Sequence, residues 1–123
     1  MENVDIGYFL EMQGDLWEYN HDITDKETKE PMDCSGLHAL MVIKRIESPT
    51  APVIAKSYID WENQSEGKGA YKFLPEITKD ITPSTYFYQC YLFNEDYTFA
   101  ETLERGEIKV LPTLKAPLKP EEE

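Results

Sequence analysis

Hydrophobic and polar residues alternate with a period of two along most of the chain, as in β-strands that bury one face. The clearest case follows Asp15, where an apolar row alternates with a polar one: Trp17, Tyr19, His21 and Ile23 against Glu18, Asn20 and Asp22. Comparable runs predict further strands over 6–10, 37–46, 53–59, 70–74, 85–93, 97–103 and 107–111. The segment 76–81 could form a single helical turn.

The segments between these runs are rich in proline, glycine and charged residues, which is typical of turns. Gly106 is expected to mark a bulge or bend between the last two strands. Short strands separated by regular turn signals predict an all-β fold, an antiparallel β-sandwich of about seven strands. We expect a lead-in segment or strand over 1–13, the sandwich domain over 14–113, and an extended acidic tail over 114–123.

The run TYFYQCYLF over 85–93 is unusual because both of its faces are apolar. One row is expected to face the core: Tyr86, Tyr88, Cys90 and Leu92. The opposite row contains Phe87, Gln89, Tyr91 and Phe93. In the 37–46 run, the outer row likewise includes Leu40 and Val42.

Something must cover this outer row, because large exposed apolar patches on proteins usually mark docking sites. We expect the chain's own N-terminal segment or a neighbouring loop to cover it, with another subunit or protein as the alternative. The candidate protein interface consists of Phe87, Tyr91 and Phe93, with Leu40 and Val42 from the other strand. A sugar-binding aromatic platform is a further reading of the same row.

The composition of the chain limits the classes of partner that it can bind. The 123 residues suffice for one domain with its own core, and 41% of them are hydrophobic. No apolar run approaches the roughly 20 residues that span a bilayer, and the N-terminus lacks the pattern of a signal peptide, so we expect no membrane partner. With 24 acidic and 12 basic residues the net charge is −12. Direct nucleic-acid binding is disfavoured because it needs a basic surface.

The sequence contains few patterns typical of catalytic, phosphate-binding or metal-binding sites. Cys34 and Cys90 have no CxxC or metal-ligand spacing, and are expected to be buried thiols. His21 and His38 belong to no HxH, HExxH or GxSxG pattern, and no phosphate-binding loop occurs. The acidic residues over 22–30 do not match an EF-hand, because no glycine occupies the sixth position. We therefore expect no catalytic residues, no cofactor and no metal, and a protein that is not an enzyme.

Several short motifs occur in an order seen in small proteins of tailed phages and prophages. GDLWEY (14–19) resembles that group's GDTW-x-F strand, and 23–36 resembles its hairpin and DLTG corner. SPTAPV (48–53) resembles its SPT-x-PV connector, and ITPSTYFY (81–88) its LPPG-x-Y-x-Y segment. LERGEIKVLP (103–112) resembles its closing strand, LL-x-G-x-V-x-V-x-P. The chain departs from the pattern at Cys34-Ser35, at Ser84 and at 94–96, where a glycine is usual.

Together these motifs resemble the immunoglobulin-like N-terminal domain of phage baseplate upper proteins and related short virion proteins. The resemblance implies a non-enzymatic structural or adaptor module of a phage or prophage tail or baseplate. It also implies other phage structural proteins, and further copies of the chain, as partners, and a place in the virion after synthesis in the bacterial host cytoplasm. A phage-encoded acidic inhibitor of a host protein and a sugar-binding β-sandwich module are the alternatives.

Overall fold

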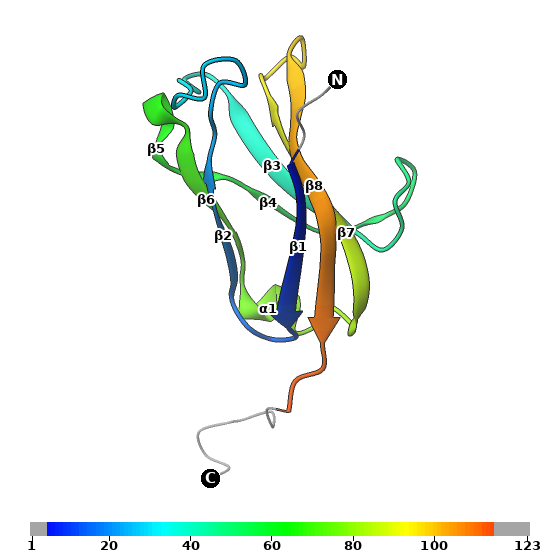
Figure 1. Cartoon of the computed structure of the whole chain (residues 1–123). Coiled ribbons are helices and arrows are strands. Elements are labelled where there is room, and N and C mark those ends of the chain that lie inside the picture. The colour runs from blue at the N-terminus through cyan, green and yellow to red at the C-terminus, as the bar shows by residue number, and fades with distance from the viewer. Residues whose placement is uncertain (1–4, 115–123) are drawn as a thin grey trace.

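The computed structural model of the chain describes residues 5–114, and this part consists mainly of β-strands (Figure 1). Eight strands lie within it: β1 Asp5–Met12, β2 Trp17–Asp22, β3 His38–Lys44, β4 Val53–Tyr58, β5 Asp60–Asn63, β6 Lys68–Phe73, β7 Ser84–Phe93 and β8 Ala100–Leu111. A short 3-10 helix, Gln64–Glu66, precedes β6, and a four-residue helix, α1 Pro75–Thr78, follows it. No helix of the described residues is long and apolar enough to cross a membrane.

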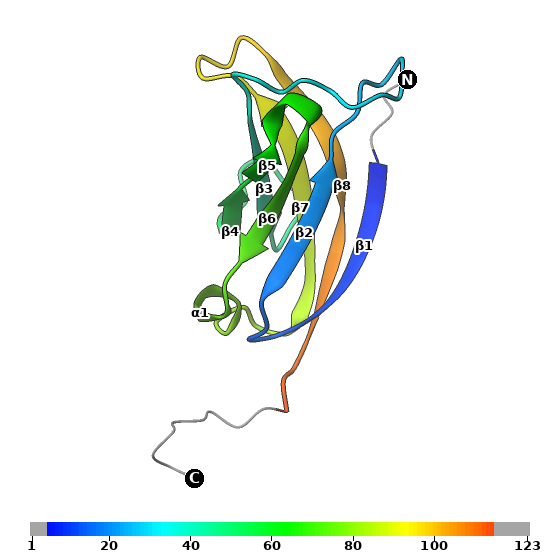
Figure 2. The same ribbon diagram turned by 90° about the vertical axis from the view of Figure 1, so that its left-hand side faces the viewer.

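The strands form two sheets that pack face to face (Figure 2). The large sheet has the order β1-β8-β7-β3-β4, and the small sheet has the order β2-β6-β5. All neighbours are antiparallel except β1 and β8, which run parallel. This order, with the second, fifth and sixth strands opposite the third, seventh and eighth, is that of immunoglobulin-like sandwiches. The predicted fold class is confirmed, with eight strands rather than about seven.

The core lies between the sheets and is built from the predicted inward rows. Trp17, Tyr19 and Ile23 from β2 and its C-terminal end are buried, as are Ala39, Met41 and Ile43 from β3. The four expected residues of β7, namely Tyr86, Tyr88, Cys90 and Leu92, are buried with them. Each large apolar side chain contributes about 1.5–3 kcal/mol when it is removed from water. The alternation in the sequence therefore corresponds to the main stabilising layer of the fold.

A hydrogen bond from a tyrosine fixes the corner where the chain enters β7. The Tyr86 hydroxyl donates to the carbonyl oxygen of Thr82 at 2.6 Å, and the ring is 5% exposed. A tyrosine that bonds back to the backbone at this corner is a feature of immunoglobulin-type sandwiches. Nearby, α1 closes one end of the sandwich, and the fully buried Thr78 hydroxyl donates to the Asp15 carbonyl at 2.6 Å.

The N-terminal strand is placed differently from the expectation. β1 pairs with β8 along all eight of its residues, so this part of the expected lead-in belongs to the sandwich. Because β8 separates β1 from β7, residues 5–12 do not cover the outer row of β7, which leaves a neighbouring loop as the part of the chain expected to cover it. The expected tail lies outside the described residues from position 115 onward.

Gly106 does not form the expected bulge or bend, because β8 continues through it without a break. The register shift between β7 and β8 falls at Cys90 and Tyr91 instead. Gly106 lies opposite Gly7 of β1, where an added Cβ atom would come within 2.0 Å of the Gly7 carbonyl oxygen. The glycine is needed because the two backbones approach closely, which is one of the reasons for glycine within a strand.

Candidate interaction surface

The outer row of β7 is covered in part by the loop that follows it. Phe93 is only 5% exposed, because the ring of Tyr97 stacks on it and those of His38 and Tyr91 lie beside it. Leu40, opposite Tyr91 on β3, is also 5% exposed although it lies outside the main core. Phe93 and Leu40, two of the five candidate interface residues, are therefore largely covered and offer little surface to a partner.

The other three candidates, Val42, Phe87 and Tyr91, are half-buried and line one groove. The groove has a volume of about 490 Å³ and lies on the outer face of the large sheet. β3 and β7 form its floor, and the connection between β3 and β4 forms its wall. The sequence prediction thus brings these three residues together at one site. The remaining lining residues are Lys44, Ile46, Glu47, Ser48, Pro49, Val53, Tyr88, Gln89 and Arg105.

Polar contacts hold the groove wall against the sheet. The Lys44 ammonium donates to the carbonyl oxygens of Ser48 and Pro49, each at 3.1 Å, and so closes the β3–β4 connection on itself. At the other side, Arg105 of β8 forms an ion pair with Glu47 of the connection. The wall is therefore attached to two different strands, which keeps Ile46 and Pro49 over the groove floor.

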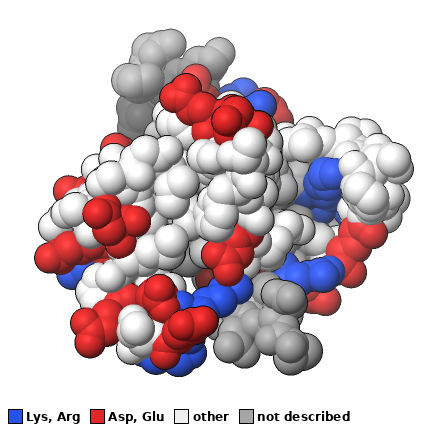
Figure 3. Space-filling view, turned by 90° about the horizontal axis from the view of Figure 1, so that it is seen from above, with Lys and Arg blue, Asp and Glu red and all other residues white. Residues whose placement is uncertain are grey.

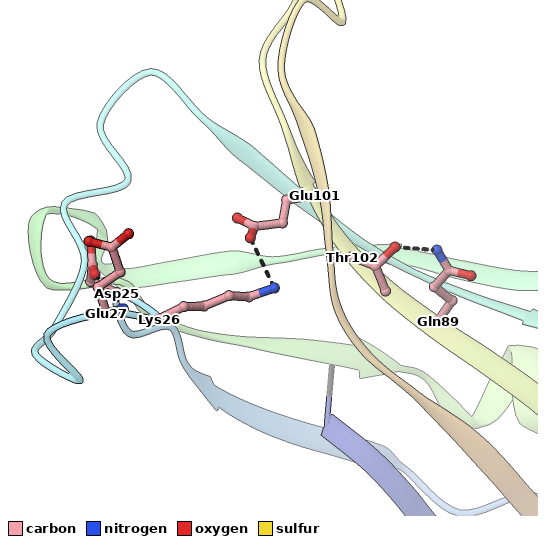
Figure 4. A network of polar contacts seen from close by, with 6 residues as sticks. All are labelled: Asp25, Lys26, Glu27, Gln89, Glu101 and Thr102. Carbon is pink, nitrogen blue, oxygen red and sulfur yellow. Dashed lines mark hydrogen bonds and ion pairs between the residues drawn. The ribbon is translucent and has the colours of Figure 1, made fainter. Parts of the chain in front are cut away.

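A second set of polar contacts lies at the end of the sandwich that carries the 24–31 hairpin (Figure 4). Lys26 of the hairpin forms an ion pair with Glu101 of β8 at 2.9 Å. Close by, the Gln89 amide on β7 donates to the Thr102 hydroxyl on β8 at 2.9 Å. The first contact joins the hairpin that follows β2 to the large sheet, and the second joins two strands on the outer face.

The charge of the outer face differs from that of the whole chain. Four basic side chains project from it or line its groove, Lys44, Lys56, Arg105 and Lys109, against two acidic ones, Glu47 and Glu107. The chain as a whole has a net charge of −12. The face around the groove is therefore locally basic, and it suits an apolar segment flanked by acidic residues.

The two cysteines and His21 have the contacts of structural residues. Cys34 and Cys90 are free and buried, as predicted, and burial raises the pKa of the Cys90 thiol to about 12. A thiol with a raised pKa is a poor nucleophile at neutral pH. His21 lies 2.9 Å from the Tyr71 hydroxyl through Nδ1, and burial raises the pKa of that phenol. Within residues 5–114, no group of three or more ligating side chains is arranged to hold a metal ion.

The groove wall and its anchors were not predicted from the sequence. Ile46 was expected at the end of the 37–46 strand, Pro49 in the turn that follows, and Arg105 beside a bend at Gly106. A signal was present in Lys44, a basic residue that directly precedes a proline-containing loop in an acidic chain. Such a side chain can bind the free carbonyl groups of a turn, since lysine has three donors and no acceptor.

Comparisons with known proteins identify a shared fold but no family. No family model matches the sequence, and no curated protein matches it. One solved structure, the N-terminal domain of phage TP901-1 ORF48, superimposes with a TM-score of 0.54 over 89% of this chain and 89% of that chain. The two share a fold. Their sequences are 12% identical, so the likeness extends to the sandwich alone. The expected resemblance to phage proteins is confirmed to that extent.

Proposed function

We propose that this chain is a non-enzymatic structural or adaptor protein of a phage or prophage tail or baseplate. It acts through protein contacts, with the outer groove as the contact site. The observation that carries the proposal is the groove itself: an apolar floor of Val42, Phe87 and Tyr91 on a fold that a phage protein domain shares. Apolar concave surfaces with a polar rim are typical of protein docking sites.

The partners under this proposal are other phage structural proteins and further copies of the chain. The protein would be made in the bacterial host cytoplasm and act in the virion, without direct contact to nucleic acid or membrane. The locally basic rim of the groove favours an apolar partner segment with acidic flanks. Association of this kind is expected to weaken as salt is added, because exposed charges are screened.

At the end of the sandwich that carries the hairpin, the acidic residues are not arranged as an acidic inhibitor would require. A protein that imitates nucleic acid should present its carboxylates in a continuous row on one face. Viewed from the end that carries the hairpin, Asp and Glu lie in separate groups around the rim, with uncharged surface and several basic residues between them (Figure 3). The pattern is that of a solvated acidic surface, which keeps a protein soluble.

The test is co-migration of the purified chain with the tail and baseplate proteins encoded alongside it. The parent should co-migrate with at least one of them in gel filtration, and Phe87→Ser and Tyr91→Ser should not. Leu74→Ser is the matched control, because Leu74 is an exposed apolar residue outside the groove. If the two groove variants bind and assemble like the parent, the groove is not the contact site. Binding to a glycan array would instead support a sugar-binding module.

A further inference from the structure

The two sheets have four free edges, and three of them are protected against pairing with another strand. β4 carries Lys56 and a register shift, and its Ser57 hydroxyl accepts a hydrogen bond from the backbone of Lys72. β5 is four residues long and also has a register shift. β2 presents a polar outer row, Glu18, Asn20 and Asp22. Charges, bulges and short length are the usual means by which proteins prevent edge-to-edge association.

The fourth edge, β1, is long and has no bulge, and its one described charged side chain, Glu11, points inward near the end of the strand. Its pairing with β8 is regular over eight residues, and the stretch IGYFL at 6–10 carries no charge and no proline. The outer side chains are apolar and open to solvent: Ile6 is 75% exposed, and Tyr8 and Leu10 are each 58% exposed. A long, regular and apolar edge strand is a template for pairing with a further strand.

We propose that β1 pairs with β1 of a second copy, antiparallel and about a two-fold axis at Phe9. The pair would join the two large sheets into one continuous sheet of ten strands, with the outer rows of both copies on the same face. Two-fold symmetry is the commonest arrangement of homo-oligomers, and it requires a self-complementary surface. This contact lies on a different part of the sheet from the groove and is independent of it.

The side chains of β1 select this register. With Phe9 opposite its own copy, Tyr8 lies opposite Leu10 and Ile6 opposite Met12, so every pair on the outer face is apolar. On the inner face, Glu11 lies opposite Gly7, and its carboxylate keeps the hydrogen bond from the Tyr19 hydroxyl of its own copy. Moving the axis to Leu10 would place the Glu11 carboxylate opposite the Phe9 ring, which pairs a charged side chain with an apolar one.

The net charge of the chain and the half-buried state of Phe9 are consistent with a second copy of the chain as the partner of β1. Two chains that each have a net charge of −12 repel one another, and they can approach most readily where the surface is uncharged, as it is over 6–10. Phe9 packs on Tyr19 and Tyr88 inside the sandwich but remains half-buried, because no strand lies beyond β1 within residues 5–114. One strand edge and four outer side chains per copy make a small interface, at the low end of the roughly 1,200–2,000 Å² of stable complexes. The dimer should therefore dissociate on dilution.

Two tyrosines provide a matched test, because each is 58% exposed on the outer face of an edge strand of the same sheet. Tyr8 lies on β1 and Tyr58 on β4. In sedimentation velocity, the parent mass should rise from one chain toward two between low micromolar and near-millimolar concentration. Tyr8→Lys should weaken the dimer about a hundredfold or more, because it places a charged side chain opposite the apolar Leu10 of the other copy. Tyr58→Lys should leave it unchanged.

A charge-pair experiment tests the register. In their own sheet, position 8 faces Glu107 and position 10 faces Lys109, so Tyr8→Lys and Leu10→Glu each place a charge beside its opposite and should preserve folding. Each variant alone should remain monomeric, and an equimolar mixture should recover a species of two chains, because position 8 of one copy meets position 10 of the other. Three results would overturn the proposal: a parent that is monomeric throughout, a dimer lost with Tyr58→Lys and kept with Tyr8→Lys, or a mixture that fails to associate.

Discussion

Tyr97 stacks face to face on Phe93, with the ring centroids 4.9 Å apart and the ring planes inclined by 7°. Tyr97 has a left-handed backbone, with φ of 59°, which costs a non-glycine residue about 1–2 kcal/mol. The loop is held by the Asn94 side chain, whose oxygen accepts a hydrogen bond from the Phe99 backbone at 2.9 Å. The strained position is thus stabilised by its surroundings, and it brings an aromatic ring over the outer row of β7.

Replacement of Tyr97 by alanine should destabilise the protein by about 1 kcal/mol, the usual value of an aromatic pair beyond its buried area. Tyr97→Phe, which keeps the stack, should be close to the parent. Urea denaturation followed by tryptophan fluorescence would measure both. If the two variants lose equal stability, the hydroxyl group rather than the ring stabilises the loop.

Tyr86→Phe should reduce the free energy of unfolding by about 1–2 kcal/mol. The substitution removes the donor to the Thr82 carbonyl, and with it the hydrogen bond that fixes the buried Tyr86 ring at this corner. Tyr8→Phe, at an exposed position on β1, is the control and should have little effect in dilute solution. Equal midpoints of urea unfolding for the two variants would contradict a structural role for the corner.

Gly106→Ala should be among the most damaging single substitutions, with a loss of about 4 kcal/mol or more. The added methyl group would meet the backbone of Gly7, which has no flexible end that could move aside. Hydrogen exchange should show faster exchange along β1 than along β2 and β6. Gly14→Ala serves as the control, because its φ is +89° and an added Cβ has open space around it, so it reports the backbone cost alone. Similar losses for both would argue against the clash.

Glu11 gives the protein a pH dependence that can be assigned to one residue. Burial raises the pKa of its carboxyl group, although the Tyr19 hydroxyl donates to it at 2.6 Å. A carboxyl group with a raised folded-state pKa favours the folded state below its unfolded-state pKa, and that contribution is lost as pH rises through the folded-state value. Between about pH 4 and pH 7, the parent should therefore lose stability relative to Glu11→Gln.

Urea midpoints of the parent and of Glu11→Gln at the two pH values, in dilute solution, would measure this difference. Glu18→Gln, at an exposed position on β2, is the matched control. A difference between parent and Glu11→Gln that stays constant over the whole window would refute the assignment.

Alternation in the sequence predicted the buried rows of β2, β3 and β7 because sandwich strands bury every second residue. It could not predict the partner of β1, because periodicity describes one strand and says nothing about its neighbour. The close approach of Gly7 and Gly106 decides that pairing, and the two glycines are separated by almost the whole domain. Gly106 was correctly expected to have a structural role, but that role is the close approach of two backbones rather than a bend.

The candidate site could be predicted in part. Val42, Phe87 and Tyr91 followed from the second apolar rows, and they do line one groove. The burial of Phe93 could not be foreseen, because it depends on the left-handed turn that brings Tyr97 back over the sheet. The groove itself depends on a loop that is anchored by the Lys44 ammonium, a three-dimensional contact with no periodic signature.

The parallel pairing of β1 and β8 also determines how the domain would respond to a mechanical pull. The start of β1 and the end of β8 lie at opposite ends of the sandwich (Figure 1). Tension between these two points acts along the common strand direction, so it slides the strands past each other instead of peeling them apart. All eight residue pairs share that load at once, whereas a hairpin opened from its ends loses its bonds singly. The domain is thus arranged to transmit force along its length.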